Sequence, residues 1–172
     1  MLPTTLLDKI KDTFEAEMVA GGRLYGVNWI DWGYSPPPLA SSQFPIIFIS
    51  IDRAMYPMVV AAQGAECSYD EHYWISISVG SYIVETAAGV GGYKATFTEA
   101  LTLMRGIRHI AHENKKWDGL CYTSEFAEEE DEEWGVFPLD RNADNIAFGI
   151  TAILHCRSRS QASSSSSSSS ST

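Results

Sequence analysis

The stretch from His72 to Glu113 changes its hydrophobic period half-way, and this change constrains what core the chain can build. The first half alternates apolar residues with serines, a period of two that predicts a half-buried β-strand. Its inward-facing residues are Ile75, Ile77, Val79 and Ile83. The second half places apolar residues at helical spacing, at Phe97, Leu101, Met104, Ile107 and Ala111. Thr96 and Glu99 form a capping box, so we expect an amphipathic helix from about Thr96 onward, packed on a sheet.

The rest of the chain supplies a second helix and more strands. Apolar residues spaced by four predict a helix over residues 5–20, which Gly21 and Gly22 would end. Further strands are expected at residues 23–32, 44–51, 58–62, 120–126 and 145–157, with a turn at WDG and a small aromatic anchor at WGVFP. This order predicts an α+β fold, a mainly antiparallel β-sheet with two amphipathic helices packed against it.

The domain is expected to span residues 1–159, with a Ser-rich tail at 160–172 that has nothing to bury. Its core should include Ile150 and Leu154, which share one face of the last strand. The two best strands are longer than usual, so we expect them either to break at Gly80 and Gly149 or to project beyond the core.

Charge and cysteine content exclude several classes of protein. The formal net charge is −10, but residues 125–133 hold seven acids and no base; without them 15 acids face 12 bases, or −3. A general nucleic-acid surface is therefore disfavoured. No apolar run has the length to cross a bilayer, and no signal peptide is recognisable. The three cysteines lack a CxxC spacing, so we expect reduced thiols rather than a disulfide or zinc site.

Three patterns imitate ligand sites, and each has a plainer explanation. His109 and His112 resemble a metal pair, but they share the helix face opposite the core. The glycine-rich stretch 89–96 lacks the spacing of a phosphate loop and is expected to be a flexible turn. The Asp and Asn residues at 140–144 lack the glycine and glutamate of a calcium loop, although weak calcium binding by the acidic run stays open. We therefore expect no enzymatic activity, no cofactor and no tightly bound metal.

Candidate interaction residues are aromatic, proline-rich or acidic. Tryptophans beside predicted turns favour a protein interface over a core position. Three consecutive prolines impose a stiff connector, and an acidic run must stay solvated or meet a basic partner. The candidates are Trp32, Pro36, Pro37, Pro38, Trp117, Glu128, Glu129, Glu130, Asp131, Glu132, Glu133 and Trp134.

The layout resembles the tail terminator and tail-completion proteins of long-tailed bacteriophages. The resemblance rests on an N-terminal helix TTLLDKIKDTFEAEM, the strands FPIIFISI and WISISV, the helix TFTEALTLMRGIRHIAHE and a closing strand NIAFGITAILHC. Together they cover residues 1–157 as a pattern of elements, without an invariant motif.

This resemblance implies a non-enzymatic virion protein, a homo-hexameric ring that caps the tail tube and joins it to the head connector. Its partners would be copies of itself, the tail tube protein and connector or neck proteins. DNA would pass through the lumen without specific binding, and assembly would occur in the host cytoplasm. The PPP loop, the acidic run and the serine tail depart from the family pattern, so another neck or head-completion adaptor remains an alternative. From other classes, a small hydrolase or a ligand-binding domain remains open.

Overall fold

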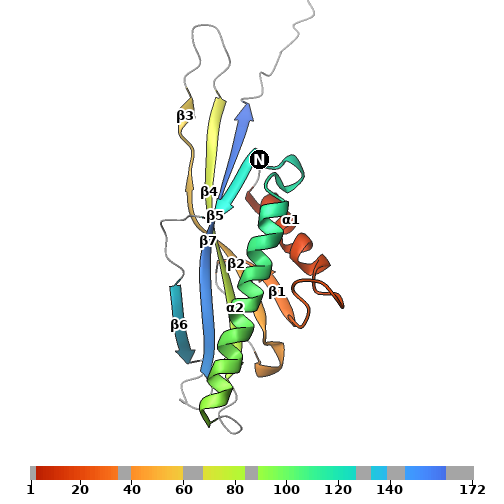
Figure 1. The fold of residues 1–172 in the computed structure, drawn as a ribbon. Helices are drawn as coiled ribbons and strands as arrows, with labels where there is room; N and C mark the ends of the chain where they lie inside the picture. Colours follow the sequence, from red (N-terminus) through yellow and green to blue (C-terminus); the bar gives the residue numbers. More distant parts are fainter. Residues whose placement is uncertain are drawn as a thin grey trace, which may run out of the picture.

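The computed structural model describes residues 3–34, 40–59, 68–83, 89–126, 133–138 and 146–161. It has the α+β fold expected from the sequence, two helices against a mixed and mostly antiparallel sheet (Figure 1). The helices and strands are α1 (Pro3–Ala16), β1 (Trp29–Trp32), β2 (Ile46–Met55), β3 (Met58–Val59), β4 (Ser68–Ile83), α2 (Gly89–Glu113), β5 (Thr123–Phe126), β6 (Glu133–Pro138) and β7 (Ile146–Gln161). Short 3-10 turns lie at Ser41–Gln43 and Trp117–Gly119.

The centre of the sheet is the antiparallel pair β4 and β7, which are joined along their whole length. The register runs from Ser68 opposite Gln161 to Ile83 opposite Ile146. Each strand has 16 residues, so at about 3.3 Å per residue each reaches roughly 53 Å. Neither strand breaks at its glycine, because Gly80 and Gly149 face each other in an unbroken ladder. The ends of β3, β4 and β7 project beyond the helices, and β7 continues past the expected boundary at residue 159 (Figure 1).

Short strands line both sides of the central pair. On the β4 side, β2 runs antiparallel to β4, β1 runs parallel to β2, and β3 pairs with β4 beyond the end of β2. On the β7 side, β5 and β6 pair with successive parts of β7. The strand expected at residues 44–51 is found as β2, which lies between β1 and β4. The segment WGVFP, expected as an aromatic anchor, instead forms most of strand β6.

Both helices pack on one face of the sheet and close the main core (Figure 1). From α1, the core takes Leu6, Leu7, Ile10 and Phe14. This helix ends at Ala16, before the expected glycine pair, and β1 is only four residues long because residues 17–26 form turns. The core predictions for Ile75, Ile77, Val79, Ile150 and Leu154 are confirmed, since all five are buried.

The helix α2 departs from the sequence expectation in two ways. It begins at Gly89, so the glycine-rich stretch expected as a flexible turn is helical. Its buried stripe is also rotated: Phe97 is 38% exposed and Leu101 is only partly buried. The buried positions are Ala100, Leu103, Met104, Ile107, Ile110 and Ala111. Gly106 explains the rotation, because a Cβ there would lie 2.9 Å from the Arg23 carbonyl oxygen. The side of α2 that contains Gly106 therefore packs directly against the backbone at Arg23.

This rotation predicts unequal costs for two truncations on the same helix. Met104→Ala removes a side chain that is 1% exposed and should lower the free energy of unfolding by about 2–5 kcal/mol. Phe97→Ala should cost less than about 1 kcal/mol, because the larger ring is already partly in solvent. Chemical denaturation of the two variants checks the expectation, and an equal or greater loss for Phe97→Ala would contradict the helix orientation.

Candidate assembly surface

The face of the sheet that points away from the helices carries half-buried aromatic and polar side chains. Along β4 and β7, alternate residues point inward and are buried, while their neighbours point to this second face. Those neighbours include His72, Trp74, Ser76, Ser78, Tyr82, Thr151, Ile153, His155 and Arg157. Within the described ranges, neither helix covers this side, which we call the open face (Figure 1).

A row of stacked side chains crosses the middle of the open face. The register places Trp74 opposite His155, and their rings stack at 4.4 Å between centroids with an angle of 9°. A shift in register between Ile51 and Arg53 brings Arg53 opposite Trp74, where its guanidinium carbon lies 4.0 Å from the ring centroid. His155 also contacts a second residue of β4, because Nδ1 of His72 lies 3.1 Å from Nε2 of His155. Four side chains from three strands thus form one contiguous stack.

The contact between the two histidine rings limits their protonation. A hydrogen bond between two imidazole nitrogens needs one donor and one acceptor, so at least one of His72 and His155 must be neutral. Burial lowers the pKa of His155, and the positive charges of Arg157 and His72 lower it further. The carboxylate of Glu125, 3.5 Å from the Arg157 guanidinium, acts in the opposite direction. Within the stack, burial and the neighbouring positive charges therefore favour the neutral form of His155.

At the far end of the open face, Phe44 and Ile46 are buried in a small second cluster, against which Trp29 and Tyr82 pack. Trp29 stacks on Phe48 with 6.3 Å between centroids, and Phe44 lies against Tyr82 at 6.1 Å. Gly80 allows this packing, because a Cβ there would lie 3.0 Å from the Ile46 side chain and 3.3 Å from the Phe44 ring. Aromatic residues and arginine are the types enriched in protein–protein interfaces. The open face therefore has the composition of a protein-binding surface.

Two of the tryptophans that the sequence placed at an interface, Trp32 and Trp117, pack against or within the core. Trp32 is half-buried, packs against the core and donates its indole N–H to Asp8 at 2.8 Å. Trp117 was expected at an interface, and this is wrong for the described fold, since it is 1% exposed. Its ring meets Phe14 edge-on, and its indole N–H donates to the Ser124 hydroxyl at 2.9 Å. The left-handed turn at Trp117, with φ of 43°, directs the ring inward.

The other predicted interface residues cannot be placed on a surface. Pro36, Pro37 and Pro38 lie outside the described residues, as do Glu128, Glu129, Glu130, Asp131 and Glu132. Glu133 and Trp134 begin strand β6, where the backbone is described but not the side chains. The calcium-like residues at 140–144 also lie outside the described ranges.

The candidate metal residues on α2 lie on the solvated side, as expected. His109 and His112 are exposed, and Glu113 accepts two hydrogen bonds from the Arg23 guanidinium at 2.5 and 2.7 Å. That ion pair lowers the pKa of Glu113, because the hydrogen bonds from Arg23 stabilise the carboxylate. In the part of the chain that the structure describes, no group of three or more His, Cys, Asp or Glu residues is arranged to hold a metal ion.

Two cysteines that are distant in the sequence meet in the core. Cys121 and Cys156 are both buried with free thiols, and a hydrogen bond joins them. That hydrogen bond lowers the pKa of Cys121, whereas the same bond and burial raise the pKa of Cys156. Their contact follows from strand pairing, since Cys156 lies opposite Ser124 on β5, and the sequence alone gave no sign of it.

Comparison with known proteins found no family model and no curated protein that matches this chain. Among the described residues, no helix combines the length and apolar character that crossing a membrane requires.

The lowered pKa of His155 predicts how stability depends on pH. As the pH falls through the ordinary histidine value of 6.5, the unfolded chain binds a proton that the folded chain resists. The free energy of unfolding should therefore be highest above that value and decline below it. Denaturation between about pH 8 and pH 5 measures this dependence. The His155→Gln variant should show a weaker dependence of the free energy of unfolding on pH. The control variant His109→Gln, on the exposed side of α2, should keep the pH dependence of the wild type. An unchanged pH dependence in His155→Gln would contradict this account.

Proposed function

We propose that this chain is a structural subunit that assembles with copies of itself and with other proteins. The observation that carries the proposal is the open face, a sheet surface with stacked aromatic, histidine and arginine side chains that neither helix covers within the described ranges. Covering half-buried aromatic side chains in a contact with another protein removes further apolar surface from water, which favours association.

The side chains of the open face are already held in contact with one another, and this suits a binding role. Trp74 is held between Arg53 and His155, while Ser78 and Thr151 share a hydrogen bond of 2.8 Å across the two central strands. Side chains ordered before binding lose less conformational entropy when a partner arrives. A rigid surface on a continuous sheet therefore favours a permanent protein contact over a mobile catalytic pocket.

The specific role that we propose is a ring at the head–tail junction of a long-tailed bacteriophage. The support is the resemblance in element order to tail terminator proteins, together with a long central strand pair that reaches past the helices. In this proposal six copies form a ring that caps the tail tube and meets the connector or neck proteins. DNA passes through the lumen without specific binding, assembly takes place in the host cytoplasm, and the finished protein is part of the virion.

The open face predicts a variant that folds but assembles poorly. Trp74→Glu places a charge in the centre of the stack and should weaken self-association by at least about tenfold, since central tryptophans often dominate interface energies. Tyr25→Glu is the matched control, because Tyr25 is 67% exposed in the turn region before β1. Sedimentation velocity measures the association, and thermal melting confirms that both variants fold.

The ring itself is tested by electron microscopy of the wild-type protein with and without purified phage tail tubes. We expect discrete rings, either free or at one end of each tube. A protein that stays monomeric at high concentration and does not bind tubes would overturn the proposed function.

A further inference from the structure

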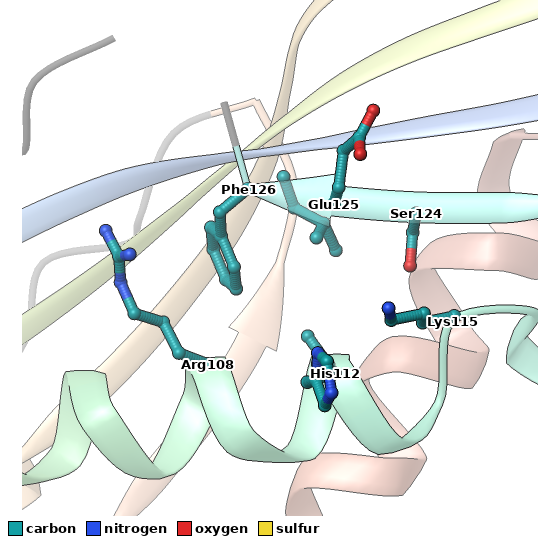
Figure 2. A pocket seen from close by; sticks show the side chains of 8 residues that line it. Arg108, His112, Lys115, Ser124, Glu125 and Phe126 are labelled. Carbon is teal, nitrogen blue, oxygen red and sulfur yellow. The ribbon is translucent and has the colours of Figure 1, made fainter. Parts of the chain in front are cut away.

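The stack on the open face belongs to a longer row of side chains with opposite charges at its two ends. Arg53 of β2 lies opposite Trp74 of β4, which lies opposite His155 of β7. On the far side of β7, His155 lies opposite Glu125 of β5. Figure 2 shows that Glu125 points away from α2, and therefore toward the open face. This line across four strands, which we call the charged row, begins with a cation and ends with an anion.

Both charged ends of the row can accept a further partner. The Arg53 guanidinium contacts the aromatic ring of Trp74, and with the described residues it forms no ion pair. Its N–H groups therefore remain available to a carboxylate. Glu125 lies 3.5 Å from Arg157 through one oxygen, Oε1, and 61% of its side chain is exposed. The second oxygen of Glu125 is thus open to a donor from outside.

The helices form the opposite side of the subunit, and the exposed ridge of α1 is acidic. Asp8, Asp12 and Glu15 are exposed and follow one another at spacings of four and three residues, which places them on one face of the helix. Asp8 accepts the Trp32 indole N–H at 2.8 Å, and Glu15 lies 3.8 Å from Lys11. Within the described ranges Asp12 forms neither an ion pair nor a side-chain hydrogen bond. Asp12 is therefore the acid of this ridge that is most open to a partner.

The exposed ridge of α2 is basic. His109, His112 and Lys116 follow one another at spacings of three and four residues, and all three are exposed. The one acid between them in the sequence, Glu113, is bound by the Arg23 guanidinium through two hydrogen bonds. The helix side of the subunit thus has an acidic ridge on α1 and a basic ridge on α2.

These two ridges lie behind opposite ends of the charged row. The helix α1 packs on β1 and β2, whereas α2 packs on β4, β7 and β5 (Figure 1). Both helices also reach the height of the row along the strands. Trp117 meets Phe14 of α1 and donates to Ser124, the chain neighbour of Glu125, while the second half of α2 borders one cavity with β5 (Figure 2). The acidic ridge therefore lies behind the Arg53 end of the row, and the basic ridge behind its other end.

We propose that the open face of one copy packs on the helices of the next copy, with Arg53 against Asp12 and Glu125 against His112 and Lys116. The inference rests on the proposed self-assembly and names the surface that covers the open face. A copy displaced perpendicular to its own sheet brings opposite charges together at both ends of the row. Such a contact joins two different surfaces, so its repetition with a rotation closes a ring, whereas two open faces paired with each other would stop at two copies.

Short side chains beside the row leave room for a helix. Along β4, the residues that separate Trp74 from Tyr82 on the open face are Ser76, Ser78 and Gly80. A band of short side chains between aromatic rings accommodates the protruding ridge of a helix, and close fit of this kind is typical of protein interfaces. The shape of the open face therefore agrees with its charges in favouring a helix as the partner.

The test exchanges the charges of one proposed pair in the full-length protein. Arg53→Glu and Asp12→Lys each place like charges in the contact and should weaken self-association at least about tenfold in sedimentation velocity. An equimolar mixture of the two variants should associate as the wild type does, because every open face then meets a ridge of opposite charge. A chain that carries both substitutions should recover in the same way.

Two controls make the same changes of charge outside the contact. Lys94→Glu and Glu99→Lys alter exposed residues in the first half of α2. At about 1.5 Å per residue, Glu99 lies roughly 20 Å and Lys94 roughly 27 Å along the helix from His112. Both control variants should associate as the wild type does, and thermal melting confirms that every variant folds.

The outcomes separate this contact from the proposed ring. If rings form and Trp74→Glu weakens them while Asp12→Lys assembles normally, the open face meets another surface, and the inference is overturned while the ring stands. Association that stops at two copies and is weakened by Arg53→Glu alone would show two paired open faces and would also overturn it, as would a mixture that does not recover. If the wild type forms open chains instead of rings, and the mixture restores what each variant loses, the ring fails and the contact stands.

Discussion

The pairing of β4 with β7 is the interaction on which the rest of the structure depends. It joins two strands that are separated in the chain by α2, β5 and β6, and it holds them in register over 16 residues. Because the side-chain period of a strand is two, a slip of one residue would move core residues such as Ile77 and Leu154 to the opposite face. It would disrupt both the core under the helices and the open face. Each flanking strand except β1 pairs directly with one of these two strands.

The same ladder gives the sheet two different faces. One face supplies the isoleucines that α1 and α2 cover, and it also contains Tyr73, whose hydroxyl donates to Glu71 at 3.0 Å. Burial raises the pKa of Tyr73 well above its ordinary value, and the hydrogen bond to Glu71 adds to this effect, so the phenol stays neutral. The other face carries the stack of Trp74 and His155, and the proposed role in assembly depends on this division.

Periodicity alone predicted the fold class and the direction in which most strand residues point. It could not predict the rotation of α2, because Gly106 sets that rotation through a contact with Arg23, far away in the sequence. Trp117 was misplaced for a similar reason, since a left-handed turn and a hydrogen bond to Ser124 draw its ring into the core. The stack on the open face exists only once strands from distant segments are paired, so its residues carry no local signal in the sequence.

We propose that the open face becomes covered when the protein assembles. Hydroxyl-radical footprinting read by mass spectrometry measures the exposure of individual aromatic side chains in the monomer and in the assembled protein. We expect oxidation of the half-buried Trp74 to fall several-fold on assembly, while Trp117, already 1% exposed, stays unreactive in both states and Tyr25 stays reactive in both. Equal oxidation of Trp74 in the monomer and the assembly would contradict the account.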